Sequence, residues 1–222
     1  MITKILMLVS LLLPWSIRRR FLESQFGYSL HPTSHIGFCW VFPRRLIMEE
    51  NSCIGHLNVC RNIDLLHLGP CALIGQLNWV TGFPTGPSRH FAHQTDRRPE
   101  LIVGAHAAIS SRHLIDCTER VRIGAFANLA GFRSQLITHS IDLQAGRQAA
   151  EPIEIGEYCF VGTNCVMLGG SSLPHHSVLG AQSLLNKKWD EPYRLYGGVP
   201  AKPLKELSHE MEYFRRTEGF VW

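Results

Sequence analysis

Apolar residues recur at every sixth position over long stretches of the chain. Two runs of six keep an aliphatic, aromatic or sulfur-containing side chain at every step. Their members are Ile36, Phe42, Met48, Ile54, Cys60 and Leu66 in the first run, and Ile155, Val161, Met167, Leu173, Leu179 and Leu185 in the second. Helices repeat their apolar residues at three and four, and strands alternate at two. A period of six therefore predicts neither a long helix nor a long strand.

The period predicts short strands separated by tight turns. Glycine often follows the apolar residue, as in Ile54-Gly55 and Val161-Gly162, and suits a corner conformation that side chains resist. Stacked coils of three such strands bury a continuous aliphatic ladder, and each strand pairs with the coils above and below. The pattern predicts an all-β solenoid, a parallel β-helix with three faces and eighteen residues per coil, three times the six-residue period.

The period slips at a few places. The steps from Ile115 to Ile123 and from Leu129 to Ile137 are eight residues long, and we expect two-residue corner bulges to absorb them. In this register Ile115 stacks beneath Ile137, and the eighteen residues from Ile137 to Ile155 form one full coil. Residues 81–100 are rich in Gly, Pro and Arg and lack the period, which predicts one external loop at a corner.

The N-terminal segment, residues 1–30, has a different character. An apolar run from Ile5 to Leu13 precedes Arg18, Arg19 and Arg20. The run is too short to span a bilayer, which needs roughly 20 apolar residues. Two readings stay open: a helix that lies on an anionic membrane surface, and a helix that packs on its own domain or on a partner.

The remaining chain divides into two parts. Residues 31–200 carry the repeat and form the predicted β-helix. Residues 201–222 place Leu207, Met211 and Phe214 at helical spacing, which predicts a short helix that caps the last coil and covers its unpaired strand edges.

Composition narrows the class of protein. The net charge of +4 is too small to indicate nucleic acid binding. Seven cysteines without a Cys-x-x-Cys pair predict reduced, structural thiols rather than disulfides or a metal site. We therefore expect a cytoplasmic protein without a metal, in peripheral contact with the inner face of the membrane if the N-terminal helix binds there.

Two later segments carry a resemblance. The stretches FVGTNCVMLGGSSLPHHSVLGAQSLL and LYGGVPAKPLK, together with the repeat, resemble the hexapeptide-repeat acyltransferases, such as the maltose, galactoside, serine and colanic-acid acetyltransferases. The similarity covers roughly residues 36–206. It implies a left-handed β-helix, a homotrimer, acetyl-CoA in a cleft between subunits and a histidine as general base.

The stretch LITHSIDLQAGRQAAEPIEIG matches the family's layout around its histidine, and the resemblance gives His139 the role of base. An imidazole can take the proton of an acceptor hydroxyl as it attacks the thioester. Asp142, near in sequence, and Asp116, one coil below, are both candidates to orient the base. His113 is a second candidate for the base or for the acceptor pocket.

Further site residues follow from the same resemblance. We expect a set of polar residues near the histidines to contact the acceptor, namely Arg112, Asp116, Arg133 and Gln135. We expect small residues at corners and nearby cations to bind CoA, namely Phe160, Gly162, Thr163, Gly180, Ala181, Lys187, Ala201 and Lys202.

These expectations predict transfer of an acetyl or short acyl group from acyl-CoA to a sugar hydroxyl, in the synthesis of a surface polysaccharide. Two alternatives stay open. One is a metal hydratase like the γ-class carbonic anhydrases, whose fold is similar, and the other is a β-helical scaffold subunit without catalysis.

Overall fold

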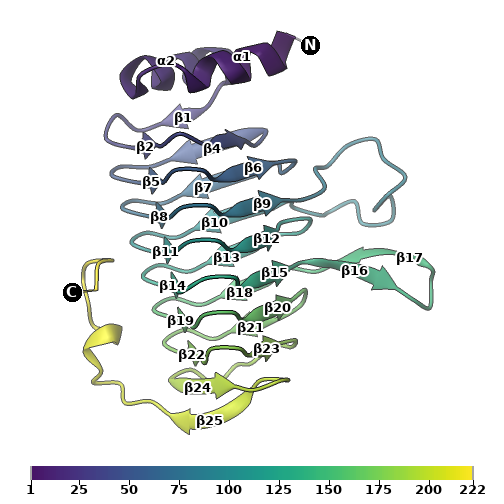
Figure 1. Ribbon diagram of the computed structural model, residues 1–222. Helices are drawn as coiled ribbons and strands as arrows, with labels where there is room; N and C mark the ends of the chain where they lie inside the picture. The colour runs from purple at the N-terminus through teal and green to yellow at the C-terminus, as the bar shows by residue number, and fades with distance from the viewer. Residues whose placement is uncertain (1, 222) are drawn as a thin grey trace.

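Short parallel strands wind around one axis and form three sheets that enclose the core (Figure 1). This architecture comes from a computed structural model that describes residues 2–221. Met1 and Trp222, at the outer ends of the predicted terminal segments, lie outside the described residues. The predicted all-β solenoid is confirmed.

Each sheet takes one strand from successive coils. Sheet A contains β1 (Ser29–Leu30), β4 (Arg45–Met48), β7 (Leu65–Leu68), β10 (Glu100–Val103), β13 (Val121–Ile123), β18 (Ile153–Ile155) and β21 (Ser172–Leu173). Sheet B contains β2 (His35–Ile36), β5 (Cys53–Ile54), β8 (Leu73–Ile74), β11 (Ala108–Ile109), β14 (Asn128–Leu129), β19 (Phe160–Val161), β22 (Val178–Leu179), β24 (Arg194–Gly197) and β25 (Lys202–Glu206). Sheet C contains β3 (Trp40–Phe42), β6 (Val59–Arg61), β9 (Trp79–Thr81), β12 (Leu114–Asp116), β15 (Gln135–Ile137), β20 (Val166–Leu168) and β23 (Leu184–Leu185).

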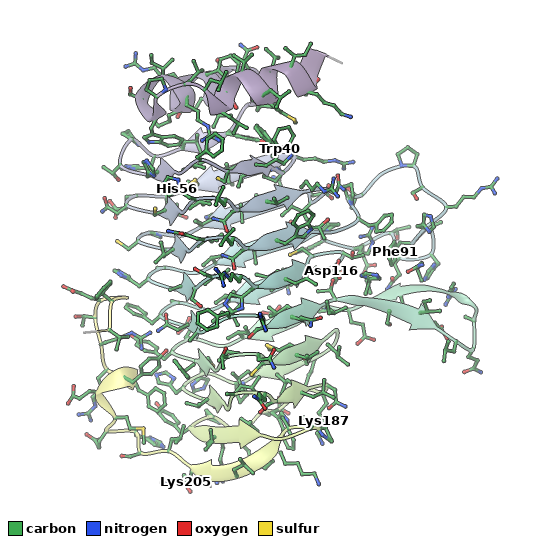
Figure 2. The ribbon with its side chains drawn as sticks, viewed as in Figure 1. Trp40, His56, Phe91, Asp116, Lys187 and Lys205 are labelled. Carbon is green, nitrogen blue, oxygen red and sulfur yellow. The ribbon has the colours of Figure 1, made fainter. Side chains whose placement is uncertain are left out.

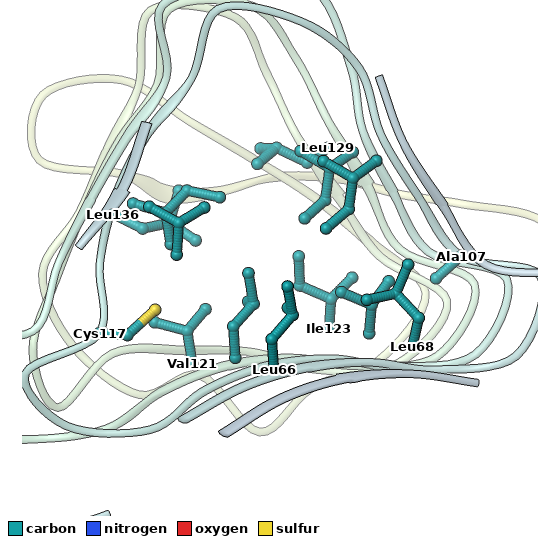
Figure 3. Packing of buried hydrophobic residues seen from close by; sticks show 14 of the residues in the cluster. Leu66, Leu68, Ala107, Cys117, Val121, Ile123, Leu129 and Leu136 are labelled. Atoms are coloured by element: carbon teal, nitrogen blue, oxygen red, sulfur yellow. The ribbon is translucent and has the colours of Figure 1, made fainter. Parts of the chain in front are cut away.

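The six-residue runs form the core. Every member of both runs is buried, and the second run has exposed fractions of 0–2%. Figure 3 shows core side chains, among them Leu66, Ile123 and Leu129, projecting into the space between the three sheets. All seven cysteines are free thiols, and five of them are buried. The repeat therefore marks the inward positions, as predicted.

The explanation of the eight-residue steps was wrong. Sheet A is wider than the other two in the central coils, and its strands carry two inward side chains, such as Val121 and Ile123. For the step from Ile115 to Ile123, the extra pair of residues lies within the strand and not in a corner bulge. The second step is one residue shorter than expected, because the inward residue is Leu136 and not Ile137. In sheet C, Ile115 pairs with Leu136, and Ile137 pairs with Asp116. Leu136 is the buried residue, so the predicted stacking of Ile115 beneath Ile137 is one residue out of register.

The residues from 137 to 155 do not form a single coil. Ile155 pairs with Ile123, thirty-two positions earlier, because an antiparallel hairpin is inserted between them. This hairpin consists of β16 (His139–Asp142) and β17 (Arg147–Ala150) and projects from the solenoid beside the loop that joins β9 to β10 (Figure 1). The predicted external loop is present, and the hairpin is a second projection that the sequence analysis described only as a polar loop.

Helices α1 (Ile2–Leu11) and α2 (Trp15–Phe26) cover the first coil (Figure 1). The buried guanidinium of Arg18 donates to the carbonyls of Gly37 and Cys39, at 2.8 and 3.2 Å. Leu22 joins the core with an exposed fraction of 1%. Helix α2 therefore satisfies backbone carbonyls that no preceding coil could bind.

The C-terminal end differs from the predicted helix. Strand β25 pairs antiparallel with β24 and so closes the last coil, and the only helical turn of the described tail is the 3-10 turn Glu212–Phe214. The remaining tail runs back along the solenoid (Figure 1). Residues 202–206 are extended because the open edge of β24 supplies hydrogen-bond partners for a strand.

The tail is fastened to a column of stacked rings at the corner between sheets A and B. Five rings, His106, Phe126, Tyr158, His176 and Tyr193, stack with centroid separations of 4.6–4.9 Å. Arg216 lies over Tyr213 and also hydrogen-bonds the carbonyl of Phe126. The backbone N–H of Gly219 donates to Nδ1 of His106 at 3.3 Å.

Corner glycines allow the coils to stack closely, and this predicts one stability effect. A Cβ atom on Gly124 would lie 2.6 Å from the backbone nitrogen of Glu157, which cannot move without displacing its coil. We expect Gly124→Ala to destabilise the protein by roughly 1–3 kcal/mol, or about 2–12 °C in Tm for a chain of this size. Gly180→Ala is the control, because its Cβ would meet the carbonyl oxygen of Tyr196 at an ordinary 3.5 Å. Equal Tm values for the two variants would contradict the argument.

Candidate active site

His139 lies where the hairpin leaves the solenoid, at the corner after sheet C. Parallel pairing of β12 with β15 sets Asp116 beside Ile137, two residues before His139. Nδ1 of His139 is 2.9 Å from Oδ2 of Asp116, and the backbone N–H of His139 donates to the same oxygen at 3.1 Å. The carboxylate therefore fixes both the backbone and the ring of His139.

Asp116 is itself held by two threonines. The hydroxyl of Thr138 donates to Oδ2 and that of Thr118 to Oδ1, each at 2.7 Å. The aspartate is buried, with an exposed fraction of 6%. Burial acts to raise the pKa of Asp116, but the hydrogen bonds from Thr118, His139 and Thr138 outweigh it and hold the pKa below its usual value. Asp116 is therefore a carboxylate at neutral pH.

This contact determines how neutral His139 carries its proton. A carboxylate only accepts hydrogen bonds, so Nδ1 of His139 bears the proton and Nε2 keeps its lone pair. The His139 side chain is 40% exposed, whereas that of Asp116 is 8% exposed. The arrangement gives an oriented imidazole that can accept a proton from outside the solenoid.

Asp142 does not take the place that sequence proximity suggested. Its Oδ1 accepts the backbone N–H groups of Gln144 and Ala145 at the tip of the hairpin. Its other oxygen lies 4.0 Å from Arg147. Asp116, the other candidate for this role and also an expected acceptor contact, is the residue that orients His139.

His113 is also placed differently from the prediction. It is 2% exposed, within a polar corner of the solenoid. Its Nδ1 accepts the N–H of Ser134 at 3.2 Å, and its Nε2 lies 3.0 Å from the hydroxyl of Ser110. Its own N–H donates to the side-chain oxygen of Asn78, the residue at this corner one coil earlier. His113 is therefore buried with both ring nitrogens in contact with groups of its own chain, as a structural residue would be.

Several predicted acceptor and CoA residues gather at the other end of the sheet C strands. Arg112 and Arg133 both adopt φ 61° at the corner between sheets B and C, and the N–H of Arg133 donates to the carbonyl of Arg112. Gln135 begins β15 and is exposed. Six residues separate Arg133 from His139, or up to roughly 20 Å at about 3.3 Å per residue.

The small residues of the predicted CoA site lie on this side as well. Gly162 packs on Ala181, whose nitrogen a Cβ at position 162 would approach to 2.7 Å. The hydroxyl of Thr163 accepts the N–H of Phe132. Phe160 meets the ring of Tyr213 edge to face at 6.0 Å, and Gly180 follows β22. One chain therefore does not bring these residues to His139.

The predicted C-terminal residues divide between the two sides. Lys187 follows β23, two coils beyond His139 at the same corner, and its ammonium lies 4.2 Å from the Trp189 ring centroid (Figure 2). Lys202 begins β25 and is exposed, and Ala201 is buried. Of the predicted cations, Lys187 is the one that shares a corner with His139.

Sequence reasoning missed Thr118 and Thr138. Each threonine lies two residues after an inward or corner position of sheet C, and Thr138 directly precedes His139. A Thr-His pair that lies one coil above an aspartate is the sequence pattern that could have identified these threonines. It can be recognised only when the register between coils is known. Among residues 2–221, no group of three or more His, Cys, Asp or Glu side chains is placed to hold a metal ion.

The buried state of His113 predicts a pH effect on stability. Burial lowers the pKa of His113 to about 4, against a smaller raising effect of a backbone hydrogen bond to Gly131. The unfolded chain, with a pKa near 6.5, binds the proton first as the pH falls, so stability is lost between about pH 6.5 and pH 4. The loss is on the order of 3 kcal/mol at about 1.4 kcal/mol per pH unit.

The test compares the wild-type protein with His113→Asn. Asparagine is chosen because Asn78 occupies the equivalent corner position one coil earlier. Thermal unfolding is measured from pH 7 to pH 4.5. We expect the Tm of the wild-type protein to fall more steeply than that of the variant, even if the variant is less stable at pH 7. Parallel curves would show that another group causes the acid sensitivity.

Known proteins support the fold and the class. No family model matches the chain. A chloramphenicol acetyltransferase of Klebsiella aerogenes is 25% identical over 163 residues, which cover 69% of this chain and 77% of that protein. A mutant of the Bacillus cereus N-acyltransferase AntD, solved with dTDP and coenzyme A, has a TM-score of 0.54 at 14% identity and covers 79% of this chain and 83% of that chain. A putative acetyltransferase of Bacillus cereus has a TM-score of 0.50 at 14% identity, over 84% of this chain and 82% of that chain. These likenesses confirm the predicted resemblance to the acyltransferases and the left-handed β-helix fold.

Proposed function

We propose that the protein transfers an acetyl group from acetyl-CoA to a hydroxyl group of a sugar acceptor, with His139 as the general base. The observation that carries this proposal is the 2.9 Å contact between Nδ1 of His139 and the buried carboxylate of Asp116. A surface histidine without a role has no need of an orienting carboxylate that is itself fixed by two threonines. The acetyltransferase relative supports the same class of reaction.

In this mechanism Nε2 of His139 takes the proton of the acceptor hydroxyl as its oxygen attacks the thioester carbonyl carbon. The C–S bond then breaks, and the imidazolium returns the proton to the departing thiolate, which leaves as CoA. Asp116 stabilises the imidazolium and keeps its own negative charge, because its pKa lies below the usual value. The products are the acetyl ester and the free thiol.

We also propose a homotrimer. His139 and Lys187 lie at the corner that follows the sheet C strands, whereas Gly162, Thr163 and Ala181 lie at the corner that precedes them. If a neighbouring subunit places its Gly162 corner against the His139 corner of this subunit, the two corners together complete a CoA cleft. A closed ring with three copies suits a solenoid with three faces.

A further part of the proposal concerns the N-terminal helix. Ile5, Leu8, Val9 and Leu12 form one stripe at helical spacing, with exposed fractions of 51, 56, 43 and 83%. No helix among the described residues is long and apolar enough to cross a membrane. We propose that this stripe lies in the surface of an anionic membrane, where the exposed Arg20 meets the headgroups. A polysaccharide role for the acceptor would fit this location.

The proposed base predicts a kinetic result. We expect His139→Ala to lower turnover by about two to four orders of magnitude, as loss of a general base does. Asp116→Asn should also lower turnover by at least about tenfold, because an amide can donate to Nδ1 and so favour the wrong tautomer. Release of free CoA thiol in the presence of an acceptor measures both rates.

The control for this test is His175→Ala, which removes an exposed histidine of a turn and should leave turnover unchanged. All three variants should keep their mass in light scattering and their affinity for acetyl-CoA in calorimetry. If His139→Ala retained more than about a tenth of the normal rate, the base would lie elsewhere in the chain.

The membrane proposal is tested with point substitutions. Deletion of the first twenty residues would remove Arg18, which caps the first coil, so loss of binding could not be separated from loss of structure. We expect Leu8→Ser combined with Leu12→Ser to reduce sedimentation with vesicles of phosphatidylglycerol while the Tm stays within a few degrees of normal. Sedimentation equal to that of the wild-type protein would indicate that the stripe packs on protein instead.

A further inference from the structure

A pocket lies between the two projections of the solenoid. The external loop and the hairpin are joined by the side-chain amide of Gln94, which donates to the carbonyl of Ala150 and accepts its N–H, each at 3.0 Å. This pair fixes the loop along the edge of β17. The cavity beside it has a volume of about 350 Å³, near the lower end of the range for small-ligand sites, roughly 300–1,000 Å³.

Two of the hairpin residues that line the pocket are on the same face as His139, and Arg147 lies beside the turn residue Gly146 at the tip of the hairpin. Side chains alternate between the two faces of a strand, so His139 and Ile141 share one face of β16. Ile141 is paired with Gln148, and His139 is paired with Ala150. Ile141 and Gln148 both line the pocket. The pocket therefore begins two residues along the strand from the proposed base, or roughly 7 Å.

Basic side chains dominate the lining. Arg89, His90 and His93 come from the loop and Arg147 comes from the hairpin, which makes half of the eight lining residues basic. The carboxylate of Asp142 lies 4.0 Å from Arg147 and offsets part of one charge. The lining therefore carries a net positive charge and several donors for hydrogen bonds.

The floor of the pocket is apolar and fixed. Phe91 is 4% exposed, and the buried guanidinium of Arg97 lies 4.3 Å from its ring centroid. Arg97 is anchored in turn by the carbonyls of Phe83 and Thr118. Figure 2 shows Phe91 in the loop beside the hairpin and Asp116 at the base of the hairpin. An apolar floor with cations around it suits a ring that carries an anionic group.

We propose that the acceptor is an anionic sugar, and that this pocket binds its carboxylate or phosphate while a hydroxyl of the same sugar reaches Nε2 of His139. The proposal rests on the acetyl transfer proposed above and adds the class of acceptor. Arg147 and Arg89 bind the anion, His90 and His93 add donors, and the Phe91 floor contacts the ring. Neutral sugars lack the group that the basic lining recognises.

The test measures binding separately from turnover. Ligand-observed NMR on the full chain compares D-glucose, D-glucuronate and D-glucose 6-phosphate at constant ionic strength. We expect one or both anionic sugars to bind at least about tenfold more tightly than glucose, the factor expected for one charge-assisted hydrogen bond. The carboxylate and phosphate ligands distinguish the two kinds of anion.

Variants assign the preference to the pocket. Arg147→Gln removes a cation and Gln148→Glu adds an opposing charge, and each should remove the preference for the anionic sugars. Arg98→Gln is the matched control, because Arg98 is an exposed arginine of the same loop that is not part of the lining. Equal binding of charged and neutral sugars, including no binding of either, would overturn the proposal, as would an equal effect of Arg98→Gln and Arg147→Gln.

His139→Ala separates this proposal from the proposed function. The variant should bind the anionic sugar normally and lose acetyl transfer. If His139→Ala transfers the acetyl group normally and the preference for anionic sugars is intact, His139 is not the base, but the proposal of the anion site stands. Loss of transfer by His139→Ala, with no effect of Arg147→Gln on binding, would leave the base and remove the anion site.

Discussion

Backbone hydrogen bonds between stacked coils set every other distance in this protein. The strands of successive coils pair in parallel, so where no loop or hairpin is inserted a side chain has as its neighbour a residue about twenty positions distant. That pairing places the Asp116 carboxylate beside His139, across 23 positions of sequence. Corner glycines such as Gly124 make the pairing possible, because a Cβ there would meet the backbone of the next coil. The candidate base is therefore oriented by the stacking itself.

The inward ladder could be predicted from sequence, because each inward position needs an apolar side chain and the spacing is fixed by the strand and corner. The register between coils could not, for two reasons. Sheet A carries two inward residues per strand in the central coils, which adds two positions without breaking the apolar pattern. The hairpin then inserts a segment, and Ile137 and Ile155 happen to lie eighteen residues apart although they belong to different columns.

The errors at the site follow from that register. Asp142 is near His139 in sequence, but parallel pairing brings together residues that are about one coil apart. The contact with His139 is therefore made by Asp116. His113 looked like a second site residue because burial at a polar corner leaves no mark in the sequence. His139 itself was found from a family motif, and motif positions survive changes in coil length. The C-terminal pattern of Leu207, Met211 and Phe214 forms only a 3-10 turn, in which Phe214 is buried against the rings of His176 and Tyr193.

The returning tail has a consequence for how the protein unfolds. In a simple solenoid each repeat touches only its neighbours, so the ends can fray one coil at a time. Here the hydrogen bond from Gly219 to His106 spans 113 positions, and Arg216 joins the tail to the ring column between them. Fraying of the last coils would have to release the tail from the middle of the stack. The tail thus couples the later coils into one cooperative unit, and a molecule nicked between β25 and the 3-10 turn would regain the independent coils of an ordinary repeat protein.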